Sequence, residues 1–550
     1  ARAVPVGASA WRLEALPRRA APEKPRSGNA RRKAIATIPA RDPSAAPAEI
    51  VVISSKRDTR FMDFPAQVSV LEGKELTLGG VGGTEKIIQR VATVSSTYLG
   101  SGRNKLFIRG IADSSFTGPT QATVGQYLGD LRLSYNAPDP DLRLSDLQRV
   151  EVLEGPQGTL YGAGSLGGII RIVPQVPEID RTSYHGGIGG AFTQHGAVSA
   201  DLSATANIPI AESKAALRVT IDASSEGGYI DKPLLGRTNV NRTDIFAGRI
   251  MARVEVAPDW TVDALALAQS TSANDSQYAA RDGPDYDSLA RVREGSEADY
   301  LHGQLVVSGK IGSLQLRSTT GVSGQELEER YDSSTPENEG NIFVQRNDNR
   351  MAAHETRLWL PLEDRRFGWI AGISLIKNQT QLNRTLEQGL LRAAATGVLN
   401  RITEATAYGE ASYRVRPRLI LTAGGRYTNV RLGGGAEDAR LALVAEGAAI
   451  TASRNQSAFL PSASLVAQLG PVTSFYARYQ EGFRPGGLAI EGDFVRRFRQ
   501  DNTATFELGG RHGRPGLDVF DFSVNLSHTR WSDIQADFID NFGLPSTANI

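Results

Sequence analysis

Residues 217–222 read Leu217-Arg218-Val219-Thr220-Ile221-Asp222, an unbroken alternation of apolar and polar side chains. Successive side chains of a β-strand point to opposite faces, so this stretch predicts a strand with one apolar and one polar face. The same kind of segment recurs in pairs joined by tight turns. The pairs are residues 254–256 with 260–265, 305–308 with 314–318, 358–362 with 369–376, 408–415 with 419–427, 465–469 with 474–479, and 506–511 with 519–529. The pattern predicts a large antiparallel sheet of consecutive hairpins.

The connections in this part of the chain fall into two sizes. The turns within the pairs are tight, whereas the segments between one pair and the next are long and polar. These long segments are residues 270–299, 323–353, 377–404, 429–457 and 480–503. Short turns on one side and long loops on the other are typical of an outer-membrane β-barrel, with the short turns periplasmic. A soluble β-sandwich or propeller is the alternative, but it does not need such asymmetry.

Composition agrees with this interpretation and excludes several others. The 550 residues carry a net charge of +1, so the overall charge gives no sign of a nucleic-acid partner. No run approaches the ~18–20 apolar residues of a membrane-spanning helix, although barrel strands need none because lipid-facing and lumen-facing side chains alternate. The chain has no cysteine, which excludes disulfides and thiolate metal sites.

The strands also indicate how much of a barrel the chain contains. We count about 16 candidate strands, each near the ~9–11 residues that cross a bilayer when tilted. The chain stops just past a candidate strand at 534–540. An open sheet edge in hydrocarbon leaves backbone groups unpaired, at a cost of several kcal/mol each. We therefore expect an antiparallel transmembrane β-barrel over residues 181–550 that is truncated at its C-terminus.

Residues 55–180 differ from the barrel part and predict a compact α+β domain. Short β-like runs alternate with Gly-rich turns, and one helix is expected over Thr84–Ala92 with Ile87, Ile88 and Val91 on one face. The predicted strands are residues 67–71, 106–110, 123–128, 149–153 and 168–173.

Residues 1–48 are rich in Ala, Pro and Arg and lack a sustained period. They predict a basic, flexible linker, which could also contact acidic headgroups. The run Trp11–Leu16 could instead be the last strand of a small domain, and a signalling domain could precede the linker. The chain begins at Ala1 without Met or a signal peptide, so we expect it to be internal to a longer precursor.

The stretch Glu49-Ile50-Val51-Val52-Ile53-Ser54 is an apolar, β-prone run directly after the linker. It is either the first strand of the next domain or an exposed edge to which a partner adds a strand. The pattern alone favours the first interpretation.

The sequence contains no motif for catalysis or cofactor binding in the structural context that such a motif requires. Residues 162–167 match G-x-G-x-x-G by letter, but the β-branched run 168–173 and Pro174 follow where a dinucleotide site needs a helix. No nucleophile elbow or P-loop is present, and the six histidines lack metal-ligand spacing. We therefore expect no enzyme, no cofactor and no metal site.

Three stretches carry a family resemblance. They are Leu106-Phe107-Ile108-Arg109-Gly110-Ile111, then Val124–Leu133, and above all DLQRVEVLEGPQGTLYG over 146–162, continued by GGIIRI over 167–172. In this order they resemble the plug domain of TonB-dependent outer-membrane receptors. The resemblance makes Glu49–Ser54 similar to that family's TonB box, and it reverses the preference between the two interpretations of that run.

The barrel part resembles the family through GFRPGG over 482–487, FELG over 506–509 and WSDIQ over 531–535. Two stretches depart from the family pattern. Gly129-Asp130-Leu131 stands where the family usually has Asp-Gly-Val, and Ile53-Ser54 replaces Thr-Ala in the box. The family barrel has about 22 strands, which agrees with the truncation expected from the strand count.

The resemblance implies energised uptake of a scarce solute through the outer membrane. Glu49, Ile50, Val51, Val52, Ile53 and Ser54 would pair with TonB, which is driven by its inner-membrane energising complex. The implied partners are thus TonB, outer-membrane lipid and a small solute. The plug apex would contact the solute through Arg109, Asp113, Ser114, Ser115, Phe116, Thr117 and Gln121.

An iron–siderophore complex is the solute class that the resemblance implies first. Haem is disfavoured because residues 49–180 contain no histidine, and cobalamin and saccharides stay open. The alternative from another class is a passive porin-like or adhesion barrel without TonB coupling. An enzyme housed in the barrel is a third candidate, but no catalytic constellation supports it.

Overall fold

The computed structural model describes residues 2–7, 10–14, 50–112, 120–136, 138–211, 214–336, 339–363, 365–389, 391–437, 454–491, 494–539 and 545–550. The chain divides into two compact units, Ala1–Ala48 and Glu49–Ile550. In the first unit, β1 (Arg2–Gly7) and β2 (Ala10–Glu14) form an antiparallel hairpin. β2 overlaps the strand considered around Trp11–Leu16. The flexible linker was expected over residues 1–48, so this hairpin corrects its first part. Residues 15–48 of the expected linker lie outside the described residues.

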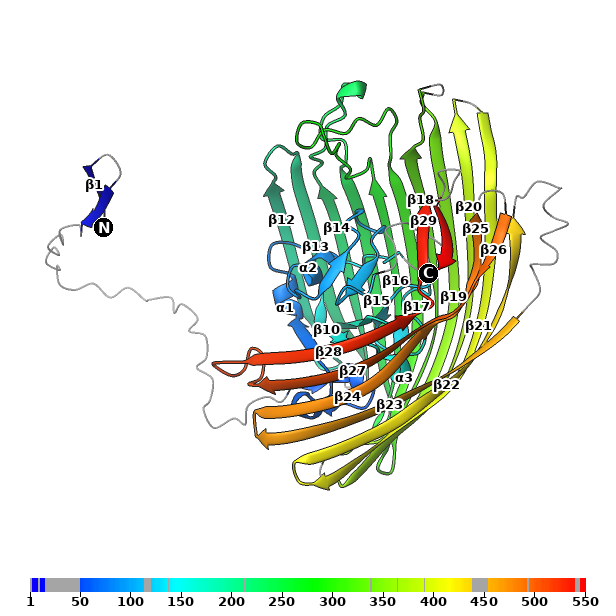
Figure 1. The fold of residues 1–550 in the computed structure, drawn as a ribbon. Helices are drawn as coiled ribbons and strands as arrows, with labels where there is room; N and C mark the ends of the chain where they lie inside the picture. The colour runs from blue at the N-terminus through cyan, green and yellow to red at the C-terminus, as the bar shows by residue number, and fades with distance from the viewer. Residues whose placement is uncertain are drawn as a thin grey trace, which may run out of the picture. The chain divides into compact units, whose positions relative to one another are not determined.

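The second unit is built on a 15-stranded antiparallel sheet, drawn from cyan to red in Figure 1. Neighbours along the chain pair throughout, except that β24 pairs with β27 across the small hairpin β25–β26. The strands are β12 (Ser183–Phe192), β13 (Val198–Ala211), β14 (Ala215–Glu226), β15 (Thr243–Ala257), β16 (Trp260–Ala273), β17 (Ser296–Ile311), β18 (Leu314–Asp332), β19 (Ile342–Leu360), β20 (Phe367–Gln388), β21 (Leu391–Arg416), β22 (Leu419–Glu437), β23 (Arg454–Gly470), β24 (Thr473–Arg484), β27 (Asp501–His512) and β28 (Phe522–Ser532). This is the antiparallel barrel sheet that the hairpin pattern predicts.

Alternation along the strands places polar side chains inward and apolar side chains outward. On β14, Thr220 and Asp222 are buried, whereas Ile221 between them is exposed. Phe246 and Leu301 are exposed in the same way on β15 and β17. An apolar outer face against lipid and a polar interior define a membrane barrel. None of the described helices is long and apolar enough to cross a membrane.

The long polar segments expected as loops are in large part strand, which corrects that prediction. β18 and β19 stay paired as far as Asp332 and Ile342, and β20 and β21 as far as Gln388 and Leu391. Beyond the bilayer the outward face meets water, so polar side chains occupy both faces while the backbone ladder continues. The alternation of apolar and polar residues therefore ends before the β-strands themselves end. The segment 274–295, between β16 and β17, is a long connection as expected.

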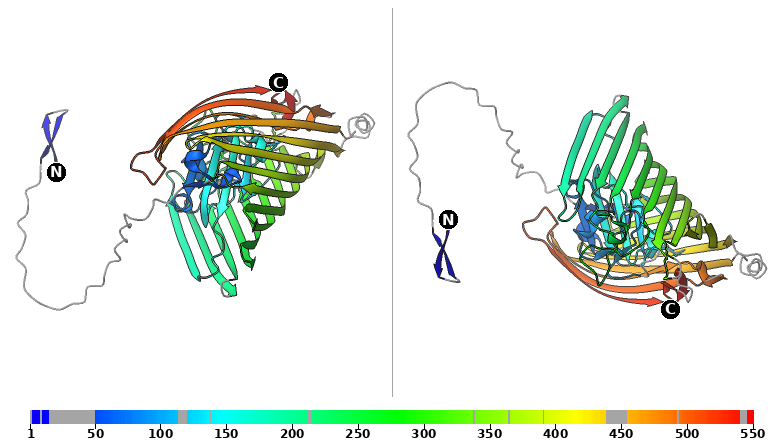
Figure 2. Two further views of the ribbon diagram at one scale, coloured as in Figure 1. Left: turned by 90° about the horizontal axis from the view of Figure 1, so that it is seen from below. Right: turned by 90° about the horizontal axis from the view of Figure 1, so that it is seen from above.

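Within the curve of this sheet lies an α+β domain, blue to cyan in Figure 2. Its five-stranded sheet has the order β5-β10-β11-β8-β9, and the pair β8–β11 is parallel. Its sheet strands are β5 (Val68–Glu72), β8 (Val124–Leu128), β9 (Leu131–Arg132), β10 (Leu147–Glu154) and β11 (Gly168–Pro174). The smaller strands and helices are β3 (Val51–Val52), β4 (Thr59–Arg60), β6 (Val94–Ser96), β7 (Leu106–Ile108), α1 (Gly73–Leu76), α2 (Glu85–Ile88) and α3 (Gly158–Tyr161).

The core of this domain continues into the barrel wall. Ile108, Val150 and Ile170 are fully buried and belong to one cluster with Met251 and Tyr300 of the wall. The domain therefore fills the lumen as a packed body. The expected plug strands are present with shifts of one or two residues at their ends.

The expected helix over 84–92 is wrong in length, since α2 has only four residues. Turns continue the segment to Val91, and Ile87 and Val91 are both buried, so the predicted apolar face is present. The two remaining hairpins, β25 (Gly487–Glu491) with β26 (Phe494–Phe498) and β29 (Gln535–Ile539) with β30 (Pro545–Asn549), lie outside the barrel sheet.

Candidate functional site

The first described residues of the second unit lie against the plug and do not extend freely. We call residues 50–55 the box segment. Val51 and Val52 form the short strand β3, which pairs with β4, and residues 53–55 continue as a single 3-10 turn. Val52 and Ser54 are fully buried. The segment is therefore neither a free edge nor a member of the main plug sheet.

Side chains of the plug hold the box segment by its backbone. The Glu151 carboxylate on β10 accepts hydrogen bonds from the N–H of Ile53 at 3.1 Å and of Ser54 at 2.7 Å. Arg149 donates to the Val51 carbonyl at 2.9 Å and to Glu151 at 2.7 Å. Hydrogen bonds to a buried carboxylate contribute about 1.5–3 kcal/mol each. Beyond the short pairing of β3 with β4, side chains thus hold the backbone of this segment in place of a sheet ladder.

A second set of contacts fixes the end of the box segment. The Tyr161 hydroxyl, from α3, donates to the Ser54 carbonyl at 2.8 Å. Lys56 pairs with Glu355 of the barrel wall at 2.5 Å and lies over the Tyr161 and Tyr408 rings at 4.6 and 5.1 Å. Burial lowers the pKa of Lys56 to about 8, although Glu355 partly opposes this shift. The segment is thereby connected to both the plug and the wall.

Away from this segment, ion pairs join the plug to the barrel. Asp130 meets Arg171 at 2.8 Å, Arg357 at 2.9 Å and Arg317 at 2.6 Å, and the last two belong to the wall. Burial raises the pKa of Asp130, but Arg317, Arg357 and Arg171 outweigh it and hold that pKa well below its usual range. Asp130 remains an anion inside this arginine cluster.

Asp130 owes its position to a two-residue turn. Leu128 of β8 pairs with Leu131 of β9, so Gly129 and Asp130 make the hairpin loop. Gly129 has φ +60°, a conformation that favours glycine. The altered order of residues at this turn therefore still forms a tight hairpin.

Two further arginines connect the plug with the C-terminal strands. Arg109 pairs with Glu154 of the plug at 2.8 Å and with Glu507 of β27. Arg484 pairs with Asp501 at 2.6 Å, with both side chains fully buried, and donates to the Gln121 carbonyl at 2.9 Å. These contacts position the plug loops against the wall.

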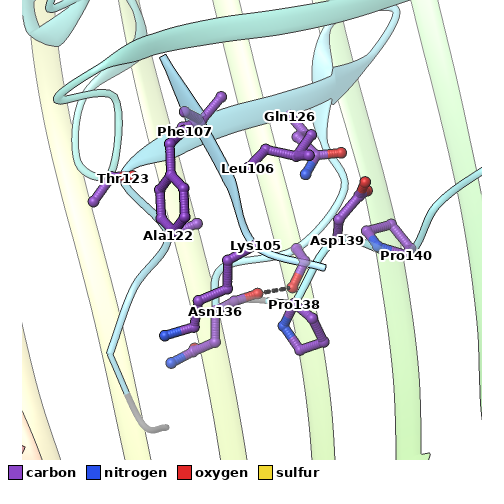
Figure 3. Close-up of a pocket in the computed structure, with 12 residues that line it drawn as sticks. Lys105, Leu106, Phe107, Ala122, Thr123, Gln126, Asn136, Pro138, Asp139 and Pro140 are labelled. Carbon is purple, nitrogen blue, oxygen red and sulfur yellow. Dashed lines mark hydrogen bonds between the residues drawn. The ribbon is translucent and has the colours of Figure 1, made fainter. Parts of the chain in front are cut away.

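The plug also encloses a small cavity of about 20 Å³ (Figure 3). Lys105, Phe107, Gln126 and Asn136 line it together with Asp139. Burial, together with the neighbouring Asp141, raises the pKa of Asp139 to about 7. A space of this volume holds about one water molecule and no solute of the size of an iron chelate. Among the described residues, no group of three or more His, Asp or Glu side chains could hold a metal ion.

Comparisons with known proteins decide the family. A model described as "TonB-dependent Receptor Plug Domain" matches residues 60–169, and one described as "TonB dependent receptor-like, beta-barrel" matches residues 226–549. The chain belongs to the TonB-dependent receptors. Its sheet is accordingly a β-barrel of the bacterial outer membrane, and the domain in its lumen is the plug.

Individual relatives of this TonB-dependent receptor are distant. The pesticin receptor of Yersinia pestis is 28% identical over 239 residues, which are 42% of this chain and 33% of that protein. The match thus spans about a third of that relative's length. The ferric yersiniabactin uptake receptor of Yersinia pestis has a TM-score of 0.74 at 19% identity, covering 86% of this chain and 73% of its own. The ferripyoverdine receptor of the outer membrane of Pseudomonas aeruginosa reaches 0.67 at 13% identity, covering 88% and 66%.

The structure places only some of the predicted site residues of this receptor. Ile50 to Ser54 lie together against β10, whereas Glu49 is outside the described residues. Of the predicted solute contacts, Asp113, Ser114, Ser115, Phe116 and Thr117 are also outside them.

The two remaining predicted contacts are not brought together on one surface. The Arg109 guanidinium is engaged by two carboxylates, and Gln121 is buried beside Arg484. The role of both residues in binding a solute stays a prediction.

Sequence reasoning missed the residues that hold the box segment. Arg149 and Glu151 lie in the quoted motif, where their alternation with Val150 and Val152 signals a strand with one charged face. That signal could have identified Glu151 as a buried acceptor. Glu355 gave no signal, because it reaches Lys56 across 299 positions of sequence.

Proposed function

We propose that this receptor takes up a ferric siderophore across the outer membrane with energy delivered by TonB. The observation that carries the proposal is the box segment, whose backbone is bound by the side chains of Glu151, Arg149 and Tyr161. Such contacts can be exchanged for a strand of another protein without unravelling the plug sheet. The printed names of the similar structures, which concern ferric yersiniabactin and ferripyoverdine, support the solute class.

The proposed cycle begins with the solute at the extracellular side of the plug. Binding there loosens the hold of Glu151 on the N–H groups of Ile53 and Ser54. Residues 49–54 then pair with TonB as an added strand, because strand addition needs these backbone groups free. Force from the inner-membrane proton gradient rearranges the plug and opens a path through the lumen.

A ferric chelate fits the chemistry of the chain. The iron in such a solute is already coordinated by its chelator, so the receptor has to recognise the outside of the complex and needs no metal-ligand cluster. The predicted contacts in 113–121 offer hydroxyl, carboxylate and aromatic groups for that purpose. Their assignment is part of the proposal.

Deleting residues 49–54 tests the coupling. We expect uptake of radiolabelled ferric siderophore to be lost, whereas deleting six residues of the linker, 30–35, leaves uptake intact. Uptake that survives the deletion of 49–54 would contradict the active mechanism and favour a passive porin-like or adhesion barrel. Growth of a receptor-deficient strain on a panel of iron sources, sugars and cobalamin identifies the solute class.

A further inference from the structure

Four basic side chains lie on the outward face of four consecutive barrel strands. They are Arg350 on β19, Lys377 on β20, Arg401 on β21 and Arg431 on β22, and all four are exposed. Their position on the outside follows from strand alternation, since the buried Asn378 and Ile402 next to them face inward. We call these four residues the basic row.

The strand register brings the basic row together. Lys377 pairs with Thr403, and Thr403 pairs with Arg431 on the next strand. One step further along the strands, Arg350 pairs with Gln379, which pairs with Arg401. Directly opposite side chains of neighbouring strands lie about 5 Å apart and diagonal ones about 7–8 Å apart. The four cations of the basic row therefore lie at two neighbouring levels along the strands, Lys377 with Arg431 and Arg350 with Arg401.

The basic row has no carboxylate partner within the described part of the chain. Other outward cations do have one: Arg330 and Arg346 both pair with Glu328, at 2.8 and 2.7 Å. The outward carboxylates Glu326 and Asp348 pair with each other in the register, one row beyond Arg350. Like charges on adjacent strands repel each other, so the basic row favours an anion from outside the protein.

The height of the basic row coincides with the outer boundary of the membrane. Lys377 lies 10 residues from the start of β20 at Phe367, and Arg431 lies 12 residues from the start of β22 at Leu419. At ~3.3 Å per residue and ~40° tilt, these positions are roughly 25–30 Å above the tight turns. The apolar band of such barrels is about 25 Å tall. Leu375 and Tyr427, just below the row, are exposed and apolar. The cations are thus placed at the level of the lipid headgroups in the outer leaflet.

A hollow of about 1590 Å³ on the same outward face adjoins the basic row. Exposed apolar side chains line it, among them Phe246, Ile250, Leu301 and Val322. Arg350, Lys377 and Arg401, from β19 to β21, also line it, as do the carboxylates Asp299 and Glu326 from β17 and β18. An amphiphile with an anionic head on β19–β22 fits this arrangement.

We propose that the basic row and the hollow form a binding site for a phosphate-bearing lipid of the outer leaflet. The phosphates contact Arg350, Lys377, Arg401 and Arg431, and the acyl chains lie along the apolar wall of the hollow. Arginine presents parallel N–H donors that match phosphate oxygens. Basic clusters at a membrane surface attract anionic headgroups with about 1 kcal/mol per side chain.

The test is a titration of the purified chain, in uncharged detergent micelles, with diphosphoryl lipid A. Native mass spectrometry counts bound lipid and gives its affinity. We expect the quadruple variant R350Q/K377Q/R401Q/R431Q to lose most binding, with about a five-fold weakening for each removed charge, equivalent to ~1 kcal/mol. The matched control R330Q/R346Q removes two outward cations that already have a carboxylate partner, and it should bind as the unaltered chain does.

Three results would overturn the proposal: equal affinity in the quadruple variant and the unaltered chain, equal binding of dephosphorylated lipid, or full competition by millimolar inorganic phosphate. The last result would indicate a site for free phosphate. The single variants K377Q and R401Q change exposed side chains and keep the test valid if the quadruple variant does not fold. Circular dichroism of each variant checks that the barrel is intact.

Discussion

Two buried carboxylates of the plug differ in what they hold. Asp130, in the β8–β9 turn, meets three guanidinium groups, two of which come from the barrel wall. Glu151, on β10, meets two backbone N–H groups of the box segment and one arginine of its own strand. One carboxylate therefore fixes the plug in the barrel, and the other fixes a segment on the plug.

The difference shows how the plug can be fixed in the barrel while the box segment can still be released from the plug. Removing the charge of Asp130 leaves the buried Arg171 and Arg357 guanidinium groups without this anion, and solvent does not reach them to compensate. Removing the charge of Glu151 weakens hydrogen bonds to backbone groups that water or another strand can satisfy once the segment leaves. Variants of the two residues should therefore affect different measurements.

The substitution Asp130→Asn should have the largest effect. It leaves the Arg171, Arg317 and Arg357 guanidiniums without their shared anion, and breaking a buried ion pair on one side costs about 3–5 kcal/mol. We expect the free energy of unfolding in detergent to fall by that amount and plug loops to become accessible to protease. Denaturant titration and limited proteolysis measure the two effects.

Asp259→Asn provides the control for that variant. Asp259 pairs with Lys310 at an exposed turn, at 3.0 Å, and exposed pairs contribute about 0–1 kcal/mol. If both variants lowered the free energy of unfolding equally, the arginine cluster around Asp130 would not be the contact that fixes the plug in the barrel.

Glu151→Gln should act on the box segment and leave the barrel stable. Gln keeps a carbonyl acceptor but loses the charge, so about 1–2 kcal/mol of the hold on Ile53 and Ser54 is lost. A cysteine introduced at Ile53, in a chain that has none of its own, reports the exposure of the segment to a thiol reagent. We expect labelling to be faster by a factor on the order of ten.

Glu72→Gln, on the neighbouring strand β5, removes an exposed carboxylate of the same plug sheet and should leave labelling unchanged. Unaltered labelling in Glu151→Gln would mean that the apolar contacts of Val52 hold the segment and that its backbone hydrogen bonds do not. Faster labelling in both variants would indicate general loosening of the plug.

Most of the fold could be predicted from the sequence, because membrane strands show their two environments as strict alternation. The hairpins from 254 to 529 were found in this way. Above the bilayer the outward face is polar as well, so alternation predicts loops where the strands β18 to β21 in fact continue. The helix at 84–92 was overestimated because a one-sided apolar pattern does not distinguish a helix from successive turns.

The candidate site could be predicted only where it is local in sequence. The box segment is contiguous in sequence, and its run of apolar, β-prone residues is visible there. Its holding residues come from β10, α3 and β19, and no short-range pattern links Ser54 to Tyr161 or Lys56 to Glu355. Contacts of this kind, between residues far apart in one sequence, become visible only once the strand register of the barrel places the residues together.

Tyr161→Phe sharpens the comparison with a smaller effect on the same segment. It removes the hydroxyl that donates to the Ser54 carbonyl and keeps the ring that contacts Tyr127. A neutral hydrogen bond contributes about 1 kcal/mol, so labelling at position 53 should rise by less than in Glu151→Gln. Tyr98→Phe, which changes an exposed hydroxyl, is the control. A larger rise in Tyr161→Phe than in Glu151→Gln would make the tyrosine the principal holder of the segment.

The smallest expected effect is a pH dependence that comes from Lys56. Its pKa is about 8 in the folded protein and near 10.5 in the unfolded chain, so the unfolded chain binds more protons between these values. The contribution of Lys56 is therefore unfavourable below pH 8 and is relieved as pH rises towards 10.5. Between pH 7.5 and 8.5 the gain in unfolding free energy should be under about 1 kcal/mol. Lys56→Met should flatten this slope in denaturant titrations, since Glu355 keeps Arg357 as a partner at 3.1 Å; an identical slope in the variant would assign the pH dependence to another group.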